Sequence, residues 1–423
     1  MRKVLVITYY WPPAGGPGVQ RWLKFVKYLS DFDIEPIVYI PQNPQYPLID
    51  ETFLKDIPKD IKIYTHKIFE PYRVASLFSS KKTKRISSGI IQSKNQSFIE
   101  KSLLWVRGNL FIPDARKFWI QPSVTFLKGV LKKEDIDTVI TTGPPHSVHL
   151  IGYSLKESLS LKWIADFRDP WTSIGYHKKL KLSSYAERKH KNLESKVLNF
   201  ADKIVVTSKT TKKEFEKITN QPITVITNGF DGERTTNATL DKKFTISHIG
   251  SMLTGRNPTN LWRVLSVLMK QNNEFKNALQ LQFIGVVSDD VLQSLTDFGL
   301  KEVYKVIGYV SHEDALKYQE TSQVLLLAEI DSHETKGIIP GKLFEYMAAQ
   351  RPILGVGPKH WEVGDIVAET NAGHIFEYAD EIALKDLLLT WFELFQKGEL
   401  SIYSKGIDTY SRKELTRKLA EFI

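Results

Sequence analysis

The chain has 423 residues, of which 42% are hydrophobic and 25% are charged, and it contains no cysteine. This composition is typical of a soluble globular protein, and the length predicts two domains. The absence of cysteine excludes a disulfide framework, a thiolate metal site and a cysteine nucleophile. No run approaches the roughly 18 apolar residues of a membrane span, so any membrane contact is expected to be peripheral.

The formal net charge of +10 is concentrated in the first half of the chain. Residues 1–230 carry 37 Lys and Arg against 21 Asp and Glu, a net of +16. Residues 231–423 carry 21 against 27, a net of −6. A basic half suits an anionic membrane surface or a phosphate-bearing substrate, and a solvated basic face is the equally weighted alternative. We expect no nucleic-acid partner, because zinc-finger spacing, a basic zipper and an aromatic RNA-binding motif are absent.

The N-terminal half opens with the elements of a parallel, doubly wound sheet. A β-branched run at residues 3–9 predicts a strand, a glycine loop follows it, and a second strand ends near Ile40. The apolar residues between these strands recur at helical spacing, namely Val19, Trp22, Leu23, Val26 and Leu29. The alternation lapses at about residues 70–121. We interpret this stretch as an insertion with one or two short helices, because it is too long for a plain loop.

The α/β alternation then returns and continues to the end of the chain. In the first half, strands are predicted at 137–142, 162–167, 203–208 and 223–227, with helices at 146–156, 183–199 and 209–218. A polar stretch at 232–243 predicts a domain boundary, and a second series of strands starts at 244–250. We therefore expect an α/β protein of two doubly wound, Rossmann-like domains, residues 1–230 and 231–400. They should face each other across a cleft, with ligands at the carboxyl ends of the strands.

The first motif with chemical meaning is the loop of Gly15, Gly16, Pro17 and Gly18 between a strand and a helix. Glycine lets a ligand approach the backbone closely, and a helix N-terminus attracts anions. The alternative is a tight turn needed only for packing.

Two further loops of the first half follow predicted strands. His146 lies in a Gly-Pro-Pro loop at residues 141–150, where a structural histidine is the commoner case. The segment 165–171 places Asp166, Arg168 and Asp169 at a strand end, and Trp171 is expected to line a sugar site. Charges at such strand ends face the ligand crevice in open α/β sheets, although an ion pair that stiffens the loop is the alternative.

The second half contains the more informative motif, residues 336–357. A glycine–proline loop leads into a helix that carries Lys342 and Glu345 three positions apart, on one helix face. Lys342 can neutralise a diphosphate, and Glu345 can accept hydrogen bonds from vicinal ribose hydroxyls. Arg256, in a polar loop after the strand that ends at Gly250, also suits a diphosphate. The alternative is an ordinary Lys–Glu surface pair.

Five segments, taken together and in their order along the chain, resemble family 4 of the GT-B glycosyltransferases, in its bacterial cell-surface polysaccharide branch. They are residues 9–21, 165–171, 201–208, 225–231 and 341–354. The resemblance covers nearly the whole chain. It implies retaining transfer without a metal ion or cofactor, with a nucleotide-diphosphate sugar as co-substrate. It also implies that residues 1–230 bind the acceptor, that residues 231–400 bind the donor, and that a helix at 401–423 crosses back to the N-terminal domain.

The residues themselves and the resemblance together give the expected roles of the motif residues. The donor is expected to be bound by Gly250, Arg256, Gly337, Pro340, Lys342 and Glu345. The acceptor is expected to be bound by Gly15, Gly16, Gly18 and Arg21, and the reacting centre to be served by Asp169, Arg168 and His146. Three sites depart from the family pattern. Gly337 occupies the position where the first of two glutamates is usual, and Glu334 is nearby. Arg168 and Asp169 occupy the place where many members have a histidine, and Asn257 occupies a position where lysine is common.

We therefore predict a cytoplasmic glycosyltransferase, peripheral on the inner face of the membrane if its basic half binds anionic lipid. Its partners would be a nucleotide-sugar donor and a glycan or lipid-linked acceptor. Two alternatives remain: another enzyme of the same fold, such as a nucleotide-sugar epimerase or a phosphorylase, and a non-catalytic subunit that binds sugar nucleotides.

Overall fold

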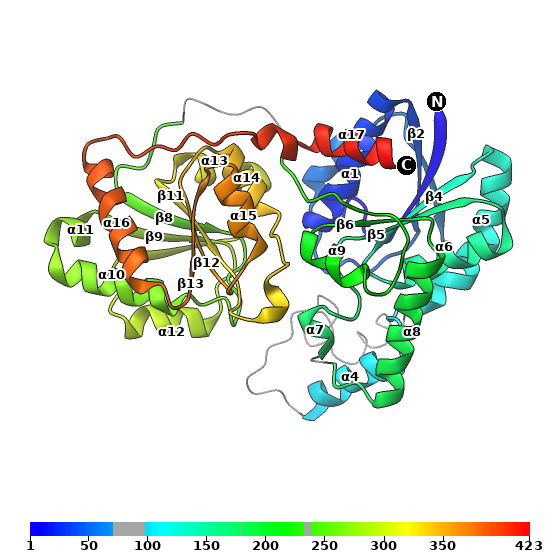
Figure 1. Cartoon of the computed structure of the whole chain (residues 1–423), viewed down its shortest axis with the longest axis horizontal. Helices are drawn as coiled ribbons and strands as arrows, with labels where there is room; N and C mark the ends of the chain where they lie inside the picture. The colour runs from blue at the N-terminus through cyan, green and yellow to red at the C-terminus, as the bar shows by residue number, and fades with distance from the viewer. Residues whose placement is uncertain (71–97, 179, 232–237) are drawn as a thin grey trace. The chain divides into compact units, whose positions relative to one another are not determined.

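A computed structural model describes residues 1–70, 98–178, 180–231 and 238–423 of the chain. It divides into two compact units (Figure 1). Unit 1 comprises Met1–Thr227 and Arg412–Ile423, and unit 2 comprises Asn228–Ser411. Within the described ranges, no helix is both long and apolar enough to cross a membrane.

Unit 1 is built on one parallel sheet of seven strands in the order β3-β2-β1-β4-β5-β6-β7. The strands are β1 (Arg2–Thr8), β2 (Ile34–Pro41), β3 (Lys62–His66), β4 (Thr138–Gly143), β5 (Lys162–Phe167), β6 (Lys203–Val206) and β7 (Ile223–Val225). The strand order reverses between β1 and β4, which both pair in parallel. At such a reversal the loops after the two strands diverge and leave room for a ligand. The predicted doubly wound fold is thus confirmed for this unit.

Helices cover both faces of the unit 1 sheet, because successive residues of a strand point to opposite sides. Leu5 and Ile7 of β1 belong to one core cluster, and Val4 and Val6 belong to another. The helices of this unit are α1 (Pro17–Leu29), α4 (Phe98–Asn109), α5 (Ile120–Glu134), α6 (Ser147–Ser158), α7 (Gly175–Lys178), α8 (Ser184–Phe200), α9 (Lys209–Phe215) and α17 (Arg412–Phe422), with 3-10 turns η1 (Ser30–Phe32), η2 (Glu51–Asp56) and η3 (Lys117–Trp119). Both faces are therefore buried, as a parallel sheet requires.

The C-terminal helix returns to the N-terminal unit, as predicted. Leu415 and Leu419 of α17 join the core cluster beside α1, and the two helices contact each other (Figure 1). The helix begins at Arg412, so it is shorter than the predicted segment 401–423. Residues 401–411 belong to unit 2, where they form the turn η5 (Ile407–Tyr410). Gly406 has a φ of +64°, outside the right-handed helical region, so the segment is not one continuous helix, and Ile407 is buried in the core of unit 2.

The predicted insertion at 70–121 contains α4 and η3, and α5 begins at its end. Residues 71–97, which include the basic segment 79–85, lie outside the described residues.

Unit 2 repeats the architecture with six parallel strands in the order β10-β9-β8-β11-β12-β13. They are β8 (Phe244–Ile249), β9 (Leu279–Ile284), β10 (Tyr304–Gly308), β11 (Val324–Ala328), β12 (Ile353–Gly357) and β13 (Gly373–Glu377). Here the order reverses between β8 and β11. The carboxyl ends of these two strands are therefore where a ligand is expected in this unit.

Helices also lie on both faces of the unit 2 sheet (Figure 1). One side holds α10 (Thr259–Gln271), α11 (Asn273–Ala278), α12 (Asp289–Asp297) and α16 (Glu381–Gln396), and the other holds α13 (His312–Thr321), α14 (Lys342–Ala348) and α15 (Glu362–Glu369), with the turn η4 (His333–Thr335) before α14. Ser311 caps α13, because its hydroxyl accepts a hydrogen bond from the Asp314 N–H. That cap satisfies one of the free donors of the first helical turn.

Candidate active site

Lys342 is the first residue of α14 and reaches the carboxyl end of β8. Its Nζ lies 3.1 Å from Nε2 of His248, a buried residue near the end of that strand. The ammonium passes over Gly250, where an added Cβ would lie 2.8 Å from Nζ. Gly250 also has a φ of +109°, which a residue with a side chain rarely adopts. Gly250 thus makes room for the lysine. That Gly250 also contacts a donor stays a prediction.

Arg256, in the loop after β8, forms a bidentate ion pair with Glu329 directly after β11. The two nitrogen–oxygen distances are 3.1 and 3.0 Å. The Glu329 side chain is 2% exposed, whereas that of Arg256 is 33% exposed. The backbone N–H of Ile330 also donates to Glu329. Arg256 is therefore oriented by a buried carboxylate and keeps one side open to solvent.

Neither Glu329 nor His248 was predicted from the sequence as a site residue. A signal was present for Glu329, because it is the first charged residue after the apolar strand β11. His248 interrupts an apolar strand with a titratable side chain, which is a weaker signal.

The electrostatics of Lys342 follow from its crowded surroundings. Burial and then the neighbouring Arg256 cation lower the pKa of Lys342 to about 7, while Glu329 and Glu345 oppose the shift. Without a ligand, about half of the molecules near neutral pH would hold an uncharged Lys342. A phosphate beside Nζ would favour the charged form, so ligand binding and proton uptake are linked at this residue.

Glu345, one turn along α14, has different partners from Lys342. Its Oε2 accepts a hydrogen bond of 3.1 Å from the amide of Gln319 on α13. Its Oε1 lies 3.9 Å from Nε2 of His312. The two α14 residues therefore do not form the ordinary surface pair considered as the alternative. Each is instead held by a neighbouring element.

The loop before α14 is fixed to α15 by two hydrogen bonds. The Trp361 indole donates to the Ile338 carbonyl at 2.8 Å, and the Glu362 N–H donates to the Lys336 carbonyl at 2.9 Å. This loop carries Gly337, and the Pro340 carbonyl accepts from the N–H of Leu343 at the start of α14. Asn257, where a lysine is usual, accepts a hydrogen bond from the Trp262 indole and so has a structural partner.

In unit 1, Arg21 and Asp166 form an ion pair of 2.9 Å whose side chains are both 0% exposed. Asp166 also accepts hydrogen bonds from the Trp22 indole at 2.7 Å and from the Thr142 hydroxyl at 2.8 Å. The other end of Arg21 donates to the Thr227 carbonyl at 2.7 Å. The expectation that Arg21 contacts an acceptor needs correction, because its guanidinium is enclosed and engaged. It holds the glycine loop's helix to β5 instead.

The remaining glycines of the α1 loop have distinct surroundings. A Cβ on Gly18 would lie 1.6 Å from Nη1 of Arg168, so the Arg168 guanidinium crosses the start of α1 only because Gly18 lacks a side chain. Gly16 has a φ of +102° and nothing within 4 Å of an added Cβ, which indicates open space. A Cβ on Gly15 would lie 2.9 Å from Leu48 and would disturb packing. Gly15 and Gly18 are therefore required by close packing, whereas Gly16 borders open space.

Arg168 and Asp169 follow β5 and are the partly exposed charges at its carboxyl end. Their side chains are 20% and 39% exposed, and they lie 3.4 Å apart. They are placed where a ligand at the strand ends of unit 1 could meet them.

His146 and Trp171 are instead buried against each other. The two rings stack at 5.0 Å with an interplanar angle of 2°, and they are 4% and 1% exposed. Burial lowers the pKa of His146 well below its usual value, and the nearby His149 adds to the shift. Two expectations therefore need correction. Trp171 belongs to the core and lines no open sugar site, and His146 is too enclosed to touch a substrate in this conformation.

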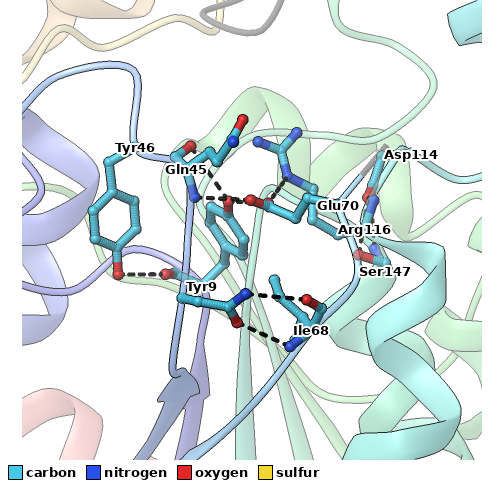
Figure 2. A network of polar contacts seen from close by, with 9 residues as sticks. Tyr9, Gln45, Tyr46, Ile68, Glu70, Asp114, Arg116 and Ser147 are labelled. Carbon is cyan, nitrogen blue, oxygen red and sulfur yellow. Dashed lines mark hydrogen bonds and ion pairs between the residues drawn. The ribbon is translucent and has the colours of Figure 1, made fainter. Parts of the chain in front are cut away.

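A buried polar network lies after β1 and β3, and the sequence analysis did not anticipate it (Figure 2). The Tyr9 hydroxyl donates to Glu70, and Nε of Arg116 lies 3.4 Å from the same carboxylate. Asp114 accepts hydrogen bonds from the N–H and the hydroxyl of Ser147, both at 2.9 Å, and so caps α6. Glu70 and Asp114 stand on either side of α4 in the chain. The network thus ties both ends of the insertion to the carboxyl edge of the sheet (Figure 2).

In the described part of the chain, no cluster of three or more His, Cys, Asp or Glu side chains is arranged to hold a metal ion.

Comparisons with known proteins find a family model that matches part of the chain and solved structures that share its fold. Residues 93–234 match the model of Glycosyltransferase Family 4. The sequence matches none of the curated proteins. Among solved structures, a glycosyltransferase from Rickettsia africae shares 16% identity at a TM-score of 0.59, covering 100% of this chain and 97% of that one.

Two further structures share the fold over the whole chain. Anabaena Alr3699/HepE, in complex with UDP-glucose, shares 14% identity at a TM-score of 0.59 and covers 100% and 99% of the two chains. WaaG, a glycosyltransferase involved in lipopolysaccharide biosynthesis, shares 13% identity at a TM-score of 0.56 and covers 99% of each chain. The two parallel Rossmann-like sheets and these structures show that the chain has the GT-B fold, and residues 93–234 are similar to glycosyltransferases of family 4.

Proposed function

We propose that the enzyme moves a sugar from a nucleotide-diphosphate donor bound by unit 2 to a glycan or lipid-linked acceptor bound by unit 1. The transfer is retaining, needs neither a metal ion nor a cofactor, and serves the synthesis of a cell-surface polysaccharide. The observation that carries this proposal is the cluster of Lys342, Arg256 and Glu329 at the strand reversal of unit 2. Two solved structures of the same fold contain UDP-glucose or UDP, which is consistent with a nucleotide donor.

The chemistry explains why cations are needed at this place. Breaking the anomeric bond leaves a nucleoside diphosphate with new negative charge, while the sugar carbon gains oxocarbenium character. Lys342 and Arg256 are placed to stabilise that charge, and Glu345 is held by Gln319 to accept hydrogen bonds from the ribose hydroxyls. Gly250, Gly337 and Pro340 shape the backbone around these groups.

In unit 1, the open space beside Gly16 and the partly exposed Arg168 and Asp169 are where we place the acceptor and the reacting centre. Gly15 and Gly18 support this loop by packing. Neither His146 nor Arg21 keeps a proposed contact, since both are enclosed.

A decisive experiment replaces Lys342 by Met and measures nucleoside diphosphate binding by calorimetry. Affinity should fall by about 1.5–3 kcal/mol, the scale of a hydrogen bond to a charged group. Lys317→Met is the matched control, because Lys317 is an exposed unit 2 lysine paired with Glu313 and Asp314. Unchanged affinity in Lys342→Met would refute the donor site.

Donor hydrolysis separates the remaining alternatives. Slow hydrolysis of a nucleotide sugar without acceptor supports a transferase, whereas tight binding without turnover supports a non-catalytic subunit. Conversion of the donor to a second nucleotide sugar would indicate an epimerase. Release of a sugar 1-phosphate from a glycan in the presence of inorganic phosphate would indicate a phosphorylase.

We also propose that unit 1 lies against the anionic inner leaflet of the cell membrane, on the cytoplasmic side. Exposed apolar side chains gather around the insertion: Phe69, Leu103, Trp105, Leu110 and Phe118, each 37–58% exposed. Lys117 lies over the rings of Phe111 and Phe118, at 5.3 and 5.2 Å. Aromatic rings together with cations suit the lipid headgroup region.

The membrane proposal is tested by co-sedimentation with liposomes. Trp105→Ala with Phe118→Ala should lower binding to anionic vesicles, and binding should fall as salt rises. Tyr403→Ala serves as the control, because Tyr403 is a highly exposed aromatic residue of unit 2. Equal recovery with neutral and anionic vesicles would leave a soluble enzyme with a solvated basic face.

A further inference from the structure

His248 is a buried histidine with a partner on each side of its ring. Nδ1 lies 3.0 Å from the carbonyl oxygen of Leu326 on the neighbouring strand β11. A carbonyl can only accept, so Nδ1 carries the ring hydrogen when the imidazole is neutral. Nε2 then presents its lone pair to Nζ of Lys342, 3.1 Å away. The sheet thus fixes the tautomer that accepts a hydrogen bond from the lysine.

We propose that His248 is a positioning residue that holds Lys342 over Gly250 without neutralising its charge, so that the lysine can bind a phosphate of the donor. This inference rests on the proposed donor site. The partner of the second cation shows the contrast, because Arg256 is paired with the carboxylate of Glu329 and that pair carries no net charge. An imidazole orients an ammonium and leaves its charge available. Two of the three ammonium hydrogens then remain for phosphate oxygens.

The charge state of His248 agrees with this role. Burial lowers its pKa well below the usual value, and the Lys342 cation adds to the effect, while the carbonyls of Leu326 and Ser251 oppose it. The imidazole therefore stays neutral at physiological pH and remains an acceptor. A protonated His248 would instead repel the ammonium.

The arrangement makes donor binding depend on the proton of Lys342. The groups that face this lysine are His248 from β8, Arg256 from the following loop, Glu329 after β11 and Glu345 on its own helix. With the pKa of Lys342 lowered to about 7, most unliganded molecules are uncharged there at about pH 8. Binding of a fully ionised diphosphate should therefore take up close to one proton at that pH.

The test uses the full chain and calorimetric titrations with UDP, GDP and ADP at about pH 8, in two buffers of different ionisation enthalpy. Wild type should take up most of one proton per bound nucleotide. Lys342→Met should take up none. His248→Phe, which keeps the ring and lacks an acceptor, should bind about tenfold more weakly. His248→Gln, which retains an accepting oxygen, should restore most of the affinity.

The double variant distinguishes positioning from a merely structural role. In the Lys342→Met background, His248→Phe should cause no further loss, because the group that it positions is gone. An equal loss in both backgrounds, or no loss in either, would overturn the inference, with thermal melting used to confirm that each variant is folded. Wild-type affinity in Lys342→Met alone would instead overturn the proposed donor site itself.

Discussion

Replacing Asp166 by Asn should destabilise unit 1 more than any comparable change to a surface carboxylate. Asp166 accepts from three buried donors, on Arg21, Trp22 and Thr142, at 2.7–2.9 Å. Asparagine is nearly the same size, so the change leaves no cavity. It removes the negative charge and turns one accepting oxygen into a donor that faces other donors.

The expected cost is about 3–5 kcal/mol, the range for breaking a buried ion pair by removing one partner. The Arg21 guanidinium would remain at 0% exposure with its charge uncompensated. Glu187→Gln is the matched control. Its pair with Lys191 is as short, at 2.7 Å, but the side chains are 52% and 61% exposed. That change should alter stability by no more than the error of measurement, because water replaces an exposed partner.

Equilibrium urea unfolding followed by tryptophan fluorescence suits this comparison, because six of the nine tryptophans lie in unit 1. If Asp166→Asn lowers the free energy of unfolding by less than about 1 kcal/mol, the reasoning is refuted. Such a result would show that the cost of removing the two charges from water cancels their attraction.

The pH dependence supplies a second check on the same residue. Burial alone would raise the pKa of Asp166, but the Arg21 cation and three hydrogen bonds outweigh it and hold the pKa below the ordinary 3.8. A carboxyl with a lowered folded-state pKa stabilises the protein above its unfolded pKa, and that contribution is lost as the pH falls through the folded value. The difference between wild type and Asp166→Asn should therefore narrow below about pH 4.

Three further predictions concern other contacts. Burial lowers the pKa of His149 to about 3, so between about pH 6.5 and 3 the unfolded chain binds a proton that the folded one does not. The free energy of unfolding should therefore fall by about 1.4 kcal/mol for each unit by which the pH is lowered in this range. In His149→Gln, the free energy of unfolding measured by urea titration should depend less steeply on pH. Gly18→Ala places a methyl group on the Arg168 guanidinium and should slow transfer while leaving nucleotide affinity intact; an unchanged rate would show that the position of Arg168 is irrelevant. Gln319→Leu removes the donor that orients Glu345, so it should weaken binding of nucleoside diphosphates but not of pyrophosphate, and equal losses for both would contradict a ribose contact.

Local sequence patterns were sufficient to predict the two doubly wound sheets, whereas the return of the C-terminal helix was implied by the family resemblance. Apolar runs and helical spacing are local signals, and the strand–loop–helix alternation leaves few topologies open. Similar reasoning located Arg256 in the loop after an apolar strand and Lys342 at the start of a helix that follows a glycine–proline loop.

The partners of those residues were decided only by the tertiary structure. Lys342 meets His248 across 94 positions, Arg256 meets Glu329 across 73, and Arg21 meets Asp166 across 145. The sequence shows that a residue can donate or accept, but not which distant group folding brings within hydrogen-bond distance of it. For this reason Arg21 was predicted to bind an acceptor, although its side chain is buried. His248 was not predicted as a site residue, because it lies inside an apolar strand. Burial and long-range pairing depend on how the strands are ordered in the sheet, and that order sets which side chains are enclosed and which remain free to act.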